Sequence, residues 1–152
     1  MRGFLYLWQP AILCQHGIQT MNDNLKYGDI TDKVIGAAFE VHTFLGNGFQ
    51  EVIYQRALAL ELSRAGLTFA REVEQDIFYK ELPEPIGTRR ADFVVEGKVL
   101  VELKAISKLE EVHIAQLLNY LRAYRLEVGL LLNFGSKSMT FKRLALSQPN
   151  RR

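Results

Sequence analysis

Hydrophobic residues recur with helical spacing in two segments that follow a polar lead-in near the start of the chain. In the first segment the apolar positions follow i, i+3, i+4 spacing, which predicts a helix that begins at Asp29 or Thr31 and ends near Leu45. The second predicted helix covers about residues 50–65. The glycines within residues 46–48 tolerate positive φ, so we expect the chain to turn sharply between the two helices.

Short runs with strand character follow the helices. β-branched and aromatic residues, broken by turn-forming Gly and Pro residues, predict several strands, and one further amphipathic segment predicts a helix. We expect strands over 73–80, 90–95, 100–104 and 128–132, a helix over 110–125, and an edge strand over 141–146. This order predicts an α/β fold with a central mixed β-sheet flanked by helices.

Charged residues interrupt two of the predicted strands. Glu96-Gly97 predicts a tight hairpin between the strands at 90–95 and 100–104. Side chains alternate along a strand, so Glu102 and Lys104 should share one face, and Asp92 should lie near Glu102 across the hairpin. Two neighbouring carboxylates repel unless a cation lies between them.

A hard divalent cation suits this oxygen-rich position. We expect Asp92 and Glu102 to converge on one Mg²⁺ or Mn²⁺ ion with the Leu103 carbonyl close by, and Lys104 to lie beside it. That arrangement suits phosphodiester hydrolysis. A Glu-x-Lys pair on a strand is weak evidence alone, because exposed strands often carry alternating charges. Here the neighbouring residues are apolar, and acids in such strands are seldom incidental.

Composition narrows the functional classes. The 152 residues carry 19 Lys and Arg against 17 Asp and Glu, a net charge of +2, so any nucleic-acid contact must come from a local patch. The length and the ordinary apolar content predict one domain. The lone Cys14 excludes an internal disulfide, and a reducing cytoplasm is the expected compartment.

The first 20 residues are apolar and aromatic, but Gln9-Pro10 divides them and no clear cleavage site follows. They are too short and too broken for a transmembrane helix or an ordinary signal peptide. We therefore expect residues 1–21 to be a loosely attached extension that folding does not require, residues 22–148 to form the domain, and residues 149–152 to be a tail.

Several separated motifs resemble the GxxExxY protein family. Gly48-Phe49-Gln50-Glu51-Val52-Ile53-Tyr54 matches the signature that names the family at all three fixed positions. The other similar stretches, in the same order along the chain, are Val41-His42 to Leu45-Gly46, Arg90-Ala91-Asp92, Val101-Glu102-Leu103-Lys104, His113 to Gln116-Leu117-Leu118, and Gly129 to Gly135. The resemblance covers about residues 25–146. That family belongs to the PD-(D/E)XK nuclease superfamily, so the resemblance implies membership of this superfamily and a restriction-endonuclease-like core.

The resemblance also implies site roles. Asp92, Glu102 and Lys104 match the three motif residues, and Glu51 matches the acid on the preceding helix that often completes the metal site. Ala91 stands where the motif name expects proline.

Two further residues on the last predicted helix, Gln116 and Tyr120, resemble a Q-x-x-x-Y element that helps to hold the substrate. They lie four positions apart and so share one helix face. An ordinary polar edge of an amphipathic helix explains the same pair equally well. Arg90 could contact phosphates, and a charged strand end is the alternative.

The leading hypothesis is a Mg²⁺- or Mn²⁺-dependent nuclease that acts on DNA. One alternative is a catalytically silent nucleic-acid-binding module with the same fold, and another is a protein-interaction subunit. A nuclease that cuts both strands needs two sites, so a homodimer or a partner protein stays open. We expect no membrane association.

Overall fold

The computed structural model describes residues 25–146. Our expectations for the N-terminal extension and for the last residues of the chain lie outside this range. The described chain contains, in order, α2 (Gly28–Leu45), α3 (Glu51–Arg64), β1 (Phe69–Ile77), β2 (Gly87–Val95), β3 (Val99–Lys104), α4 (Glu111–Tyr124), β4 (Val128–Asn133) and β5 (Thr140–Ala145). No helix in this range has the length and apolar character that crossing a membrane requires.

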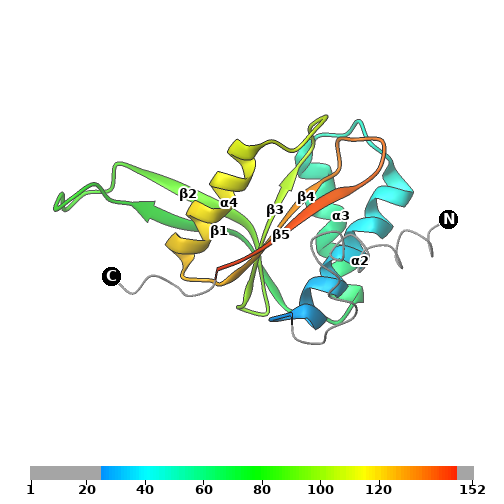
Figure 1. Cartoon of the computed structure of the whole chain (residues 1–152), viewed down its shortest axis with the longest axis horizontal. Helices are drawn as coiled ribbons and strands as arrows, with labels where there is room; N and C mark the ends of the chain where they lie inside the picture. Colours follow the sequence, from blue (N-terminus) through cyan, green and yellow to red (C-terminus); the bar gives the residue numbers. More distant parts are fainter. Residues whose placement is uncertain (1–24, 147–152) are drawn as a thin grey trace.

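The five strands form one mixed sheet in the order β1-β2-β3-β4-β5. β3 and β4 run parallel, and the other neighbours run antiparallel. A parallel pair needs a crossover connection, and α4 supplies it between β3 and β4. Helices α2 and α3 lie together on one side of the sheet and α4 lies on the other (Figure 1). The predicted α/β, restriction-endonuclease-like fold with its central mixed sheet is confirmed.

Each face of the sheet has its own hydrophobic core. The larger core packs α2 and α3 against one face and includes Phe93, Val101 and Leu103. The smaller core packs α4 against the other face and includes Leu100 and Leu131. Strand β4 is buried along its whole length because it contributes to both cores. Its continuous apolar run is typical of a strand that is covered on both faces.

The first strand differs from its predicted position. We expected 73–80, whereas β1 covers Phe69–Ile77. Its early residues, such as Arg71 and Glu72, are exposed and polar because β1 is an edge strand, and their pattern does not reveal a strand. The chain leaves the sheet after Ile77, and Lys80 takes a positive φ of 51° in the turn that follows.

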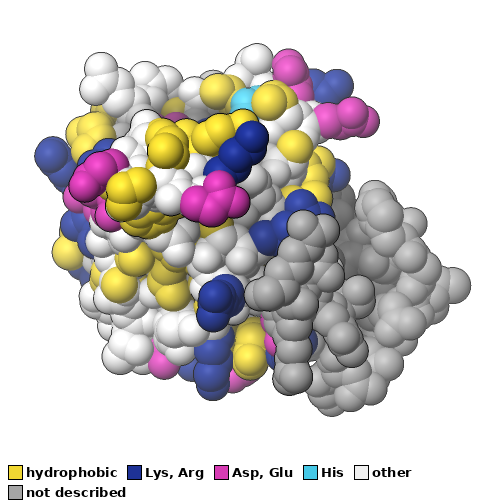
Figure 2. Space-filling model, turned by 90° about the vertical axis from the view of Figure 1, so that its left-hand side faces the viewer, with side chains coloured by type: hydrophobic (Ala, Val, Ile, Leu, Met, Phe, Trp, Pro, Cys, Tyr) yellow, Lys and Arg dark blue, Asp and Glu magenta, His cyan; other side chains and the backbone are white. Residues whose placement is uncertain are grey.

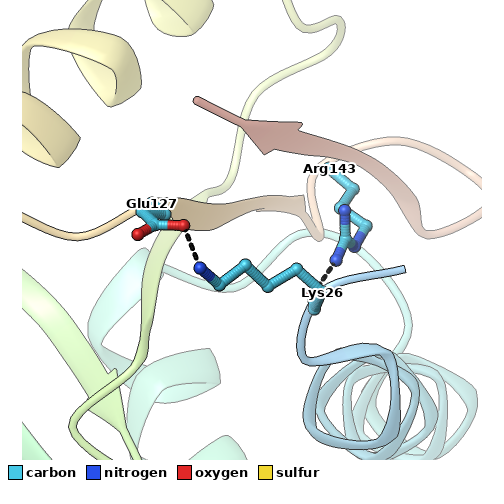
Figure 3. A network of polar contacts seen from close by, with 3 residues as sticks. All are labelled: Lys26, Glu127 and Arg143. Atoms are coloured by element: carbon cyan, nitrogen blue, oxygen red, sulfur yellow. Dashed lines mark hydrogen bonds and ion pairs between the residues drawn. The ribbon is translucent and has the colours of Figure 1, made fainter. Parts of the chain in front are cut away.

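Polar contacts attach the start of α2 to the opposite edge of the sheet (Figure 3). Lys26 forms an ion pair with Glu127, just before β4. Arg143 of β5 donates to the Lys26 carbonyl and to the Thr31 hydroxyl. These contacts fix where α2 begins and therefore how it lies across the sheet.

The β1–β2 hairpin extends past the helices (Figure 1). Its loop exposes four large hydrophobic side chains, those of Phe78, Tyr79, Leu82 and Ile86, each at least half exposed. On the face toward which this hairpin points, hydrophobic side chains lie among both basic and acidic ones (Figure 2). This face therefore lacks the single-sign charge of an electrostatic nucleic-acid surface.

Candidate active site

The backbone pairing between β2 and β3 stops where the candidate acids begin. The antiparallel register runs from Val95 opposite Val99 to Phe93 opposite Val101, and no pair beyond it continues the ladder. At the next position, Asp92 and Glu102 bridge the two strands with their side chains. Glu102 Oε1 accepts a hydrogen bond from the Asp92 N–H at 3.1 Å, and Asp92 Oδ2 accepts one from the Leu103 N–H at 2.8 Å.

The second oxygen of Asp92 faces helix α3. Its Oδ1 accepts a hydrogen bond from Gln55 Nε2 at 3.0 Å. Gln55 is buried, and its own oxygen accepts a hydrogen bond from Arg71 of β1 at 3.0 Å. A chain of polar contacts therefore runs from the edge strand through α3 to the carboxylate, and it fixes the orientation of Asp92.

The two carboxyl groups are costly to ionise together. Glu102 is only 6% exposed, and burial, reinforced by the negative charge of Asp92, raises its pKa to about 8. Burial also raises the pKa of Asp92, and the hydrogen bonds from Leu103 and Gln55 oppose this effect. Glu102 is buried and Asp92 is half-buried, and both have raised pKa values that their hydrogen bonds offset only in part. A divalent cation would stabilise the ionised form of both carboxyl groups.

Lys104 lies on the same side of β3 as Glu102. Val101 and Leu103 pack into the α2–α3 core, so the alternating residues Glu102 and Lys104 face the other way. The Lys104 side chain is partly exposed, and its positive charge lowers the pKa of Asp92 and Glu102. Its carbonyl accepts a hydrogen bond from Phe134 N at 2.8 Å, which fixes the end of β3 against β4.

Glu51, the first residue of α3, lies within electrostatic reach of Asp92 and Lys104. The residue is exposed, yet partial desolvation of its carboxyl and the charge of Asp92 raise its pKa, while the charge of Lys104 lowers it. The preceding loop is held by Tyr54, whose hydroxyl donates to the Gly46 carbonyl at 2.6 Å and accepts from Phe49 N at 3.3 Å. The Tyr54 ring stacks on Phe134 at a centroid distance of 4.7 Å. Tyr54 thus positions the loop from which Glu51 emerges.

Of the three candidate substrate contacts, Arg90 alone has an interaction with the acids that the structure shows. Gln116 and Tyr120 are partly buried one turn apart on α4, and Tyr120 packs against the smaller core. Arg90 is exposed on β2 opposite Glu74, and its charge lowers the pKa of Asp92. These placements bring Arg90 into electrostatic reach of the acids.

Three polar residues escaped the sequence analysis. Gln55 holds Asp92, and Tyr124 accepts the Ala91 N–H. Asn133, which is fully buried, accepts from the Ile106 and Gly135 amides and donates to the Ile106 carbonyl, so it fixes the loop after Lys104. Of the three, Asn133 alone had a signal in the sequence: it is a polar residue at the end of an otherwise apolar strand. Gln55 and Tyr124 had no such signal.

Within residues 25–146, no three His, Cys, Asp or Glu side chains are grouped closely enough to form a ready metal cluster. Among the acids described above, the pair of Asp92 and Glu102 is therefore the best candidate for binding a cation.

Comparison with known proteins agrees with the fold. The model of the PD-(D/E)XK nuclease superfamily matches residues 28–144, which span every strand of the sheet. Comparisons with curated proteins and with solved structures gave no significant match.

Proposed function

The chain belongs to the PD-(D/E)XK nuclease superfamily, and from that premise we propose that it is a Mg²⁺- or Mn²⁺-dependent nuclease that cleaves phosphodiester bonds in DNA. The observation that carries the proposal is the bridge between Asp92 and Glu102 at the point where β2 and β3 separate. In a regular antiparallel ladder, backbone hydrogen bonds between β2 and β3 would continue through this segment. Here two acids occupy the opening, with Lys104 on the same face as Glu102.

The residues present fit a hard divalent cation. Asp92 and Glu102 would supply carboxylate oxygens and the Leu103 carbonyl a neutral oxygen. Glu51 at the start of α3 lies within electrostatic reach of both acids, although the three do not form a closed cluster among residues 25–146. Oxygen ligands of this kind are what Mg²⁺ and Mn²⁺ prefer. Bound there, the cation would polarise a phosphoryl oxygen and lower the pKa of water.

Lys104 has a different role because a protonated amine has no lone pair to offer a metal. Its side chain is partly exposed beside both acids, so its ammonium group can hold the attacking water by a hydrogen bond. The same positive charge offsets the negative charge that grows on the phosphoryl group in the transition state.

Arg90, Gln116 and Tyr120 would hold the substrate. The exposed Arg90 guanidinium can bind a phosphate through two hydrogen bonds. Gln116 and Tyr120 present an amide and a hydroxyl from one face of α4. The resemblance of Gly48, Glu51 and Tyr54 to the GxxExxY signature is the basis for proposing that family within the superfamily, and Tyr54 holds the loop that precedes Glu51.

The exposed hairpin favours a second candidate function. Phe78, Tyr79, Leu82 and Ile86 form an apolar loop at the end of an extended arm, which is typical of a protein-contact surface. A catalytically silent module with the nuclease fold could use this arm to bind a partner protein or a second copy.

A cleavage assay separates the two candidates. Purified protein is incubated with plasmid and with single-stranded and double-stranded oligonucleotides, in EDTA, in Mg²⁺ and in Mn²⁺. We expect cleavage that requires the metal and that Glu102→Gln abolishes. If wild type binds Mn²⁺ in a calorimetric titration but cuts none of the substrates, the silent-module function replaces the nuclease.

A further inference from the structure

The two strands of the β1–β2 hairpin exchange their faces part of the way along their length. In a regular strand, residues an even number of positions apart point to the same face of the sheet. On β1, however, Phe69 packs against the larger core, whereas Val73 packs against the smaller core. On β2, Phe93 belongs to the larger core and Ala91 to the smaller one. Both strands therefore depart from regular alternation at the same level of the hairpin, and we call this departure the face exchange.

The backbone irregularity that accompanies the face exchange lies at Glu72 and Asp92. The residues on either side of these two are paired across the strands, but Glu72 and Asp92 are not paired with each other. Within β1, Glu72 also has a positive φ of 50°, which is uncommon for a residue other than glycine. Residues of a regular strand are extended, so a left-handed residue breaks the alternation of the side chains on either side of it.

Beyond the face exchange, the hairpin is attached to α4. The Ala91 N–H faces β1 and donates to the Tyr124 hydroxyl at 3.2 Å, and that hydroxyl donates to the Val73 carbonyl. Tyr124 is the last residue of α4, so its side chain lies between the two strands where a regular ladder would have a direct hydrogen bond. The part of the hairpin beyond Glu72 therefore packs on α4, and the part before it packs on α2 and α3.

The face exchange decides where the side chain of Asp92 points. If β2 continued regularly from Phe93, which faces α2 and α3, Asp92 would point to the opposite face. Instead, Asp92 accepts a hydrogen bond from Gln55 of α3 at 3.0 Å and another from the Leu103 N–H at 2.8 Å. The contact with α3 thus depends on the departure from regular strand geometry at this position.

We propose that Glu72 is a positioning residue for Asp92: its left-handed backbone permits the face exchange, which directs the Asp92 carboxylate to Gln55 and to the Leu103 amide. The Glu72 side chain is exposed, so this role belongs to its backbone conformation. An extended residue at position 72 would restore regular alternation, and the backbone at Asp92 would have to move. For metal binding, the inference rests on the proposed function, because that function assigns Asp92 to the cation.

Three substitutions at position 72 separate backbone conformation from side-chain chemistry. Glu72→Gly keeps the left-handed conformation without strain, because glycine adopts positive φ readily. Glu72→Gln removes the charge and keeps the size of the side chain. Glu72→Val opposes positive φ, since a β-branched residue rarely adopts it. Asp76→Val is the matched control, because Asp76 is an exposed acid on the same strand that pairs regularly with Thr88.

Amide hydrogen exchange without metal and calorimetric Mn²⁺ titration are measured on each variant. In Glu72→Val, we expect the Leu103 amide to exchange about tenfold or more faster, as loss of a hydrogen bond to a charged group predicts. The Phe134 amide, which donates to the Lys104 carbonyl, is the internal reference and should keep its rate. Mn²⁺ affinity of Glu72→Val should fall about tenfold or more, the usual cost of losing the orientation of a metal ligand.

The other three variants should match wild type in both measurements, and Glu72→Gly should melt at the wild-type temperature or higher. Wild-type exchange at Leu103 in Glu72→Val would overturn the inference, as would equal losses in Glu72→Gly and Glu72→Val. Faster exchange at Leu103 and Phe134 alike would indicate general destabilisation and would also overturn it, as would faster exchange at Leu103 with unchanged Mn²⁺ affinity. Wild type that binds no Mn²⁺ would defeat the proposed function, and exchange at Leu103 would still decide whether Glu72 positions Asp92.

Discussion

Asp92 and Glu102 each use one carboxylate oxygen to bind a backbone amide on the opposite strand. Glu102 accepts the N–H of Asp92 at 3.1 Å, and Asp92 accepts the N–H of Leu103 at 2.8 Å. Side-chain hydrogen bonds from these two acids therefore join β2 and β3 at the position where the backbone pairing ends. Each acid has a second oxygen, and both strands hold the acids in place through main-chain atoms.

Lys104 and Glu102 should respond differently to substitution. Lys104→Ala should leave Mn²⁺ binding intact, or slightly tighter because one nearby positive charge is lost. Its cleavage rate should fall by roughly 10²–10³, the usual cost of removing one electrostatic group from a transition state. Glu102→Gln should instead weaken Mn²⁺ binding, because a neutral amide is a poorer ligand for a hard cation.

Calorimetric Mn²⁺ titration beside a plasmid cleavage assay measures both effects. Lys142→Ala is a suitable control, because Lys142 is exposed on the edge strand β5. Cleavage by Lys104→Ala at the wild-type rate would show that this lysine has no part in the reaction.

Folding stability without metal should fall as pH rises. The pKa of Glu102 is about 8 in the folded protein, above its ordinary value of 4.5, so the folded state binds the proton more tightly than the unfolded chain does. The resulting stabilisation is complete below pH 4.5 and is lost as pH rises toward 8. The raised pKa values of Asp92 and Glu51 act in the same direction.

Thermal melts in EDTA between pH 5 and pH 8.5 test this dependence. We expect the melting temperature to fall across that window in wild type and to change much less in Glu102→Gln. Saturating Mn²⁺ should reverse most of the loss at high pH, since metal binding replaces the proton. A melting temperature that rises from pH 5 to pH 8 in EDTA would contradict the burial of Glu102 as an ionisable acid.

The acids and the lysine could be predicted because strand periodicity fixes them. Glu102 and Lys104 must share a face two residues apart, and the Glu96-Gly97 turn sets Asp92 opposite. The observed turn has positive φ at both residues, 54° and 64°, as a tight hairpin requires. Isolated charges inside apolar strands were a second signal, and Glu102 is indeed buried.

The supporting residues could not be predicted because they depend on packing between distant segments. Gln55 lies 37 residues from Asp92 in sequence, and Tyr124 lies 33 residues from Ala91. No local pattern distinguishes Gln55 from any other polar helix residue. The start of β1 was missed for a related reason, since exposed residues of an edge strand such as Arg71 carry no alternating pattern.

Gln55→Met should weaken the site without removing a ligand. Methionine matches glutamine in length but cannot donate to Asp92 Oδ1 or accept from Arg71. We expect a stability loss of about 1–3 kcal/mol from the unpaired charged acceptor, with Mn²⁺ affinity lowered by about tenfold. Calorimetry and chemical denaturation measure the two effects.

Gln75→Met provides the matched control for Gln55. Gln75 Nε2 also makes one hydrogen bond from a partly buried position, to the Ala123 carbonyl at 3.0 Å, and that bond lies on the hairpin arm. The control should lose some stability and no Mn²⁺ affinity. Equal effects of the two variants on Mn²⁺ binding would show that Gln55 has no special relation to Asp92.

Gly135→Ala tests the loop that follows Lys104. A Cβ at position 135 would lie 2.2 Å from the Ile106 amide nitrogen and 2.4 Å from the Ile106 carbonyl oxygen, so the backbone of one loop must move. That movement would also strain the Asn133 side chain, whose oxygen accepts from both the Ile106 and Gly135 amides. We expect a loss of at least about 1–3 kcal/mol of folding stability, the range for overpacking a buried position.

Because the loop that contains Ile106 continues directly from Lys104, cleavage by Gly135→Ala should fall further than its loss of stability alone explains. Gly129→Ala is the control: the atoms nearest to its Cβ would be side-chain methyls of Leu117 and Leu121, at 3.0–3.2 Å, and these can shift. Chemical denaturation with a cleavage assay well below the melting temperature measures both quantities, and Gly135→Ala with wild-type stability would show that the two loops are not locked together.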